Sequence, residues 1–209
     1  MLFWKLGANF NFIIMKKIIF RIALCVGLIF CFTQNSFAQE QTSDELKAER
    51  EALKSELKAE QTQERQKKLD ELKDPGTVGT ESVDKLAESS VLLLAGTKGF
   101  NETIPELYKR TIGETIDGVT DVTVQKPTLD ELTNLAASIA LQVTAVSETS
   151  DAVSKAAADV KALSPLKAPK ALKSLNFSKD VLSLTLPELQ LSAKVVNHLI
   201  NTLKSADNN

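Results

Sequence analysis

Few side chains of this 209-residue chain are of the types that catalyse reactions or bind metal ions. His198 is the only histidine, and the two cysteines, Cys25 and Cys31, both lie within the first 38 residues. An acid–base pair or a zinc site would need a second such group beside His198, and the sequence offers none. We expect His198 to be exposed, because it lies about 180° around a helix from Leu189, a residue of the apolar seam described below.

Other signatures of chemistry are also absent from the sequence. The segment from Gly96 to Gly99 (GTKG) lacks the spacing of a phosphate-binding loop and follows a helical pattern, so we interpret it as a helix C-cap and turn. No Gly-x-Ser-x-Gly elbow occurs, and the many acidic residues lie on helix faces expected to be solvated. The sequence therefore predicts a protein that is not an enzyme and has no catalytic residues, cofactor or metal.

Composition divides the chain into two unlike parts. Residues 1–38 carry no acidic side chain, whereas residues 39–209 carry 27 acidic and 21 basic side chains, a net charge of −6. This larger part lacks cysteine and has three aromatic residues, Phe100, Tyr108 and Phe177. An acidic chain with so few rings for base stacking is not expected to bind nucleic acid.

The first 38 residues have the composition of an export signal. Three basic side chains within residues 16–21 precede an apolar run at 22–32, and small residues lead up to Ala38. We predict a signal peptide over residues 1–38 that is cleaved after Ala38, with Met15 as an alternative start; an uncleaved N-terminal anchor is the other interpretation. The remaining chain is expected in the periplasm or outside the cell.

A helix-start signature of the form Thr-x-[Asp/Pro]-Glu-Leu recurs four times. The Thr hydroxyl can accept from the amide three residues on, the Glu carboxylate can accept from the Thr amide, and Asp or Pro suits the first turn. Four helices are therefore predicted to start at these threonines, which are Thr42, Thr103, Thr128 and Thr185.

Residues 39–74 are predicted to form a charged, mostly solvated helix. Between residues 40 and 73 the chain carries ten acidic and eight basic side chains. Leu46, Leu53 and Leu57 form a narrow apolar stripe at helical spacing. Two interpretations stay open: a single charged helix or spacer, and a short coiled coil in which these leucines contact a protein partner or a second copy.

Residues 75–209 are predicted to form an antiparallel helical bundle, which makes the fold class all-α. Two heptad seams step by +3 and +4 without interruption, which is typical of helices packed nearly parallel. Their positions are 132, 136, 139, 143, 146, 150, 153, 157 and 160 in the first seam, and 182, 186, 189, 193, 196, 200 and 203 in the second.

Two further helices are predicted before these seams. One starts at Thr80 and ends at Gly96 or Gly99, and the next starts at Thr103 and continues through Ile116 and Val119. Residues 118–124 alternate like a strand, but without an evident partner strand we interpret them as a frayed helix end.

One segment departs from the acidic background. No acidic residue lies between Asp159 and Asp180, and apolar residues and two prolines alternate there with five lysines, Lys161, Lys167, Lys170, Lys173 and Lys179. These lysines are expected either to contact an anionic membrane surface or to form a solvated linker.

The sequence thus predicts an exported, non-enzymatic helical protein that acts by protein–protein binding or as a structural adaptor of the cell envelope. Its N-terminal charged helix is the expected contact or self-association element. The alternative is a protein that binds lipid or a membrane surface through residues 161–179.

Overall fold

The computed structural model describes residues 42–116, 119–121 and 125–207, with side chains at 114–121 and 206–207 left out. The segment Gln41–Asn209 forms one compact unit. The predicted signal peptide, residues 1–38, lies outside the described residues.

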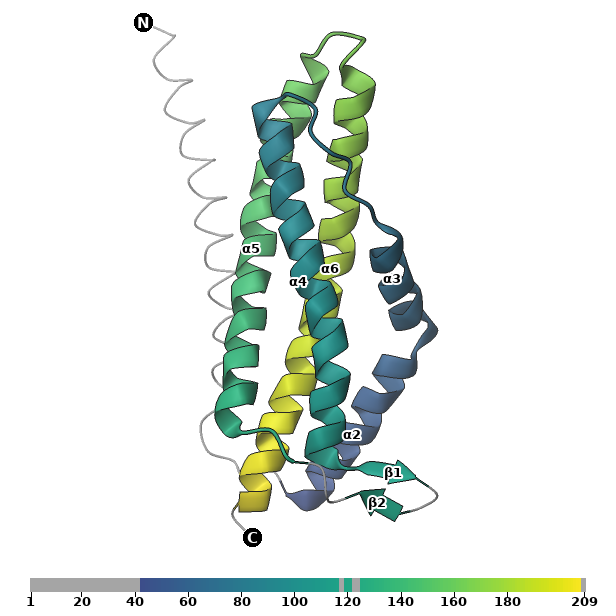
Figure 1. Ribbon diagram of the computed structural model, residues 1–209, viewed down its shortest axis with the longest axis vertical. Coiled ribbons are helices and arrows are strands. Elements are labelled where there is room, and N and C mark those ends of the chain that lie inside the picture. Colours follow the sequence, from purple (N-terminus) through teal and green to yellow (C-terminus); the bar gives the residue numbers. More distant parts are fainter. Residues whose placement is uncertain (1–41, 117–118, 122–124, 208–209) are drawn as a thin grey trace, which may run out of the picture. The chain divides into compact units, whose positions relative to one another are not determined.

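Within the described residues the fold is an all-α bundle, as predicted (Figure 1). Five helices follow one another: α2 and α3 run in the same direction, whereas α4, α5 and α6 alternate in direction and pack antiparallel to one another (Figure 1). A two-stranded hairpin interrupts this order between the third and fourth helices. The elements are α2 (Ser43–Lys58), α3 (Glu60–Glu71), α4 (Glu81–Ile112), β1 (Glu114–Ile116), β2 (Val119–Asp121), α5 (Leu129–Lys161) and α6 (Ala168–Asp207).

The charged N-terminal segment forms two helices rather than one. Thr42 caps α2 with the predicted capping box, in which its hydroxyl accepts from the Glu45 amide and the Glu45 carboxylate accepts from the Thr42 amide. The helix breaks at Ala59, whose extended backbone (ψ 137°) separates α2 from α3. Both helices lie along α6 and α4 (Figure 1).

Two of the four predicted helix starts are correct and two are wrong. Thr42 caps α2, and the Thr128 hydroxyl accepts from the Glu131 amide at the start of α5. Thr103 and Thr185 instead lie inside α4 and α6, each followed by a proline within the helix. A buried apolar face continues through both sites, and packing of that face outweighs the backbone hydrogen bond that each proline removes.

The predicted helix end at Gly96 or Gly99 is also wrong, because both glycines lie inside α4. At Gly96 a Cβ atom would overlap the amide of Gln142 on α5. Gln142 uses this space to donate from Nε2 to the Leu93 carbonyl oxygen at 3.1 Å. Gly96 therefore marks a close approach of two helices, not a C-cap.

Residues after α4 form a hairpin, so the predicted frayed helix end is wrong. Gly113 ends α4 with a positive φ of 90°, a conformation that favours glycine. β1 then pairs antiparallel with β2, with Glu114 opposite Asp121 and Ile116 opposite Val119. The partner strand that was not evident in the sequence is β1, which directly precedes β2 in the chain.

Most positions of the predicted seams lie in the core, but Ser150 of the first seam and Leu186 of the second are exposed. On α5, Leu132, Ile139 and Val146 are buried, and they belong to the main core together with residues of α4 and α6. A second, smaller core lies near the α5–α6 turn and consists of Val83, Leu86, Ala156, Val160, Ala171 and Leu175.

The α6 helix buries more than the predicted seam. A second set of buried residues, also spaced by +3 and +4, lies on another face and consists of Glu188, Leu191, Val195 and His198. Because Glu188 and His198 contact α3 and α2, this face is the one that the two N-terminal helices cover. We call these four residues the second seam of α6; they are distinct from the predicted seam at 182–203, which lies on another face of the same helix.

Candidate interaction surfaces

Neither a membrane span nor a metal cluster is found in the part of the chain that the structure describes. There, no helix is both long enough and apolar enough to cross a bilayer. No group of three or more His, Cys, Asp or Glu side chains is arranged to hold a metal ion in the same residues.

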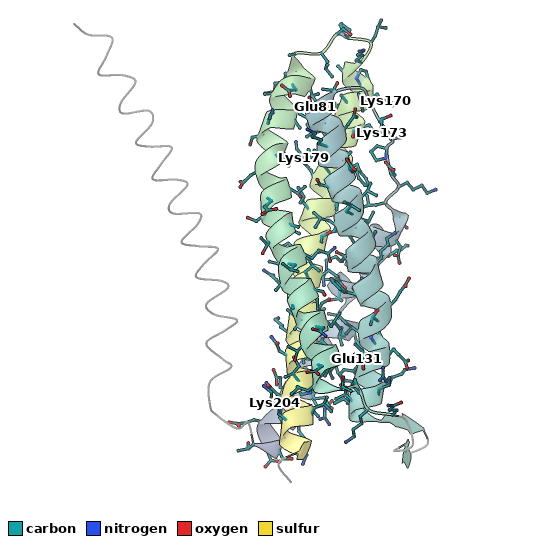
Figure 2. All side chains as sticks on the ribbon, turned by 60° about the vertical axis from the view of Figure 1, so that its left-hand side comes forward. Glu81, Glu131, Lys170, Lys173, Lys179 and Lys204 are labelled. Atoms are coloured by element: carbon teal, nitrogen blue, oxygen red, sulfur yellow. The ribbon has the colours of Figure 1, made fainter. Side chains whose placement is uncertain are left out.

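The five predicted lysines gather around the turn between α5 and α6, which we call the basic tip (residues 161–179). Lys161 ends α5, Lys167 lies in the turn, and the other three lie in the first turns of α6. All five are exposed, and none forms an ion pair with a described side chain. Figure 2 shows Lys170 and Lys173 at this end of the unit, opposite Lys204.

Apolar side chains accompany these lysines. Leu166, in the turn itself, is 94% exposed and is the most exposed large hydrophobic residue of those described. Leu172, in the first turns of α6, is 49% exposed, whereas Leu175 and Phe177 point into the two cores. The tip thus combines a protruding leucine with lysines that form no ion pair with a described side chain, although Glu71, Asp74 and Asp180 border a pocket together with Lys173.

The predicted partner-contact residues lie elsewhere and are covered by the chain's own helices. We call α2 and α3 together the strap. Leu46 and Leu53 are buried and Leu57 is partly buried, with Leu53 and Leu57 belonging to the main core. In the single chain these leucines dock the strap, and their contact with a partner or a second copy stays a prediction.

Three polar contacts attach the strap to α6. The Glu188 carboxylate, only 2% exposed, accepts from Arg65 Nε at 2.6 Å and from Gln66 Nε2 at 2.7 Å. Lys194 Nζ lies 2.9 Å from Glu56 Oε1 in an exposed ion pair. The third contact joins Glu49 to His198.

The expected exposure of His198 is wrong, because its side chain is 0% exposed. Its Nδ1 atom lies 3.0 Å from Glu49 Oε2 of α2, while its Nε2 atom is buried without a hydrogen-bond partner. The face of α6 opposite the predicted seam is covered by the strap, a second neighbour of α6 that lies far earlier in the chain. His198 is therefore a residue of α6 on which the strap docks.

Tyr108 of α4 lies near the same interface. Its hydroxyl is buried and has no hydrogen-bond partner, and burial raises the pKa of Tyr108, with the positive charges of Lys54 and Arg50 acting in the opposite direction. Arg50 Nε is also buried without a partner. The strap interface thus leaves several polar atoms unsatisfied.

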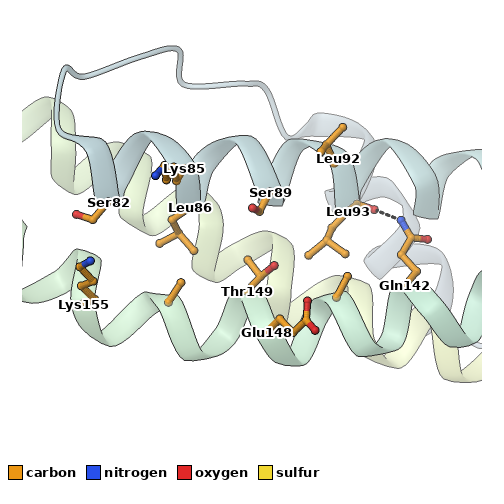
Figure 3. Close-up of a pocket in the computed structure, with 12 residues that line it drawn as sticks. Ser82, Lys85, Leu86, Ser89, Leu92, Leu93, Gln142, Glu148, Thr149 and Lys155 are labelled. Carbon is orange, nitrogen blue, oxygen red and sulfur yellow. Dashed lines mark hydrogen bonds between the residues drawn. The ribbon is translucent and has the colours of Figure 1, made fainter.

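An open groove of about 480 Å³ runs between α4 and α5 (Figure 3). Small residues such as Ser89, Ala145 and Ala152 line it, and Gln142 lies at one end, where it is bonded to the Leu93 carbonyl. In Figure 3, Leu86 and Leu93 point toward α5 and Leu92 points away. Near the other end, Ser82 Oγ donates to Asp159 Oδ2 at 2.5 Å.

Sequence reasoning found the lysines of the basic tip but missed Glu188, Arg65 and His198 as a connected set. Glu188 and Arg65 are 123 residues apart in the chain. The one available signal was Glu188 itself, an acidic residue within the otherwise apolar second seam of α6.

Comparisons with protein-family models, with curated proteins and with solved structures find no match to this chain.

Proposed function

We propose that this chain is an exported, non-enzymatic helical bundle that binds an anionic membrane surface in the cell envelope through its basic tip. One observation carries the proposal: Leu166 is 94% exposed in the α5–α6 turn, among exposed lysines that form no ion pair with any described side chain. A protruding leucine can enter the headgroup region, and the lysines can lie against anionic lipid.

The expected contributions of Leu166 and the lysines to the free energy of membrane binding are large enough to measure. Burying one leucine side chain is worth about 2 kcal/mol, and each lysine close to an anionic surface contributes about 1 kcal/mol. The overall net charge of −6 for residues 39–209 opposes approach in any other orientation. Binding should therefore be weak with neutral lipid and should weaken as salt is added.

Sedimentation with vesicles tests the proposal. We expect the chain to bind vesicles that contain phosphatidylglycerol and not vesicles of phosphatidylcholine alone. Leu166→Ser should weaken binding about 30-fold and Lys167→Gln about fivefold, from the energies per leucine and per lysine. Leu141→Ser and Lys204→Gln are the matched controls, since Leu141 is 72% exposed on α5 and Lys204 lies at the other end.

Two outcomes would refute this function. One is the absence of binding to anionic vesicles at low salt, which would leave an acidic protein as the tip's partner. The other is equal weakening by Leu166→Ser and Leu141→Ser, which would show that any exposed leucine suffices.

A second candidate function is protein–protein binding through the N-terminal charged helices. It is favoured by the polar contacts that attach the strap to α6, because such contacts can be remade with another chain.

A further inference from the structure

The strap and the second seam of α6 complement each other residue by residue. Arg65 and Gln66 surround the buried Glu188, Glu56 pairs with Lys194, and Glu49 meets His198. Between these polar contacts, Leu53 and Leu69 of the strap are buried in the same core as Leu191 and Val195. A second copy of this chain carries the same complement.

The docked strap leaves unsatisfied polar groups at its interface. Arg50 Nε and His198 Nε2 are buried without hydrogen-bond partners, as is the hydroxyl of Tyr108, which senses the charges of Arg50 and Lys54. Each such group opposes docking, because it has lost its contacts with water. Docking of the strap therefore has a desolvation cost, although α5 and α6 also carry buried polar atoms without partners, at Gln142, Ser174 and Thr185.

The segment Leu72–Thr80, which we call the hinge, joins the strap to α4. It contains no helix or strand, and Gly76 and Gly79 adopt positive φ values of 69° and 81°. Asp84 holds its far end by accepting from the amides of Val78 and Gly79. The two glycines thus allow the turn that returns the strap to its own α6.

We propose that the strap is exchangeable: the hinge opens, and two copies of the chain dock their straps on each other's α6. This inference deepens the second candidate function by naming the partner as a second copy. Strap contacts are the same within one chain and between two, so they cancel in the comparison of monomer and dimer. The balance then depends on chain concentration and on the conformation of the hinge.

A hinge variant tests this directly. Alanine at a positive φ is disfavoured by about tenfold, whereas an open hinge with negative φ carries no such penalty. A Cβ atom at Gly76 meets nothing within 4 Å, so Gly76→Ala adds only this backbone strain. A dimer opens two hinges, and we expect Gly76→Ala to lower its Kd about 100-fold.

Light scattering after size exclusion gives the readout, with the full chain made in a secreting host. The control is Gly99→Ala, because Gly99 lies inside α4 and its Cβ atom would also meet nothing within 4 Å. We expect dimers at lower concentration with Gly76→Ala and an unchanged Kd with Gly99→Ala. Monomers alone with Gly76→Ala, at every concentration reached, would overturn the proposal.

Cross-linking between two differently tagged chains supplies the second measurement. One chain carries Glu56→Cys and the other Lys194→Cys, and a short bis-maleimide reagent joins them only if the strap of one lies on α6 of the other. The control pair is Ser82→Cys with Asp159→Cys, whose contact joins α4 to α5 and is not exchanged. Interchain product with the first pair alone supports exchange; no interchain product, or equal product with both pairs, overturns it.

Leu166 and the five lysines of the basic tip form no side-chain hydrogen bond or ion pair with the strap among the described residues, although Leu172 and Lys173 border a pocket together with Glu71 and Leu72. Vesicle binding and dimerisation can therefore fail independently, and each experiment judges its own proposal.

Discussion

Gly96→Ala and Gln142→Ala, made singly and together, test how closely α4 approaches α5. At Gly96 the added Cβ atom would overlap Gln142 Nε2 and lie 2.8 Å from its Cδ and 2.9 Å from its Oε1. The whole side-chain amide of Gln142 must therefore move. It can rotate into the open groove that it borders, where water is available.

The magnitude follows from two opposing contributions. Alanine is favoured over glycine inside a helix by about 1 kcal/mol. Moving Gln142 breaks its hydrogen bond to the Leu93 carbonyl, which is worth about 1 kcal/mol. Gly96→Ala should thus leave the free energy of unfolding nearly unchanged when Gln142 is present and should raise it by about 1 kcal/mol in the Gln142→Ala background.

Urea unfolding of the four chains, followed by circular dichroism, measures this coupling. We expect an interaction energy of about 1 kcal/mol between positions 96 and 142. Gly99→Ala is the control, because it gains helix propensity without meeting another side chain. If Gly96→Ala has the same effect in both backgrounds, the close approach at Gly96 is wrong.

Two further predictions concern the strap interface. Tyr108 is the only tyrosine, so its absorbance at alkaline pH reports on it alone; because burial raises its pKa, we expect it to ionise above the ordinary value of 10.0, with stability falling as the pH rises through its folded-state pKa. A midpoint at or below 10.0 would contradict its burial. Arg65→Ala leaves the Glu188 carboxylate buried without its ion-pair partner and should lower the free energy of unfolding by about 3 kcal/mol. Lys85→Ala breaks an equally short but exposed ion pair with Glu81 and should hardly shift the urea midpoint, so equal shifts for the two variants would refute this reasoning.

Local signals in the sequence were sufficient where neighbouring residues decide the structure. Thr42 and Thr128 cap helices as predicted, because their bonds close within three residues. Most of the α5 seam was also correct, since a regular +3 and +4 spacing requires one apolar face whichever helix covers it; in its later part, however, Thr149 and Ala156 are buried and Ser150 is exposed. The fold class could therefore be predicted without knowing which helices are neighbours.

Signals failed where a distant segment decides the outcome. At Thr103 and Thr185 the capping sequence is present, but the helix continues because residues on both sides are buried by other helices. Gly96 leaves space for the side chain of Gln142 on another helix. His198 is covered by α2, whose contact residue Glu49 lies 149 residues earlier in the chain. The lysines of the basic tip were found because exposed charge needs no partner to be recognised.

The strap's anchors also set an order of events during synthesis. Arg65, Glu56 and Glu49 leave the ribosome first, yet their partners on α6 follow 123, 138 and 149 residues later. At typical synthesis rates this interval lasts about 10 s, during which the charged helices have no docking face. Their high charge keeps them hydrated over that time, and any chain that stops before α6 is complete retains an undocked strap. Docking of the strap therefore reports that the last helix has been made.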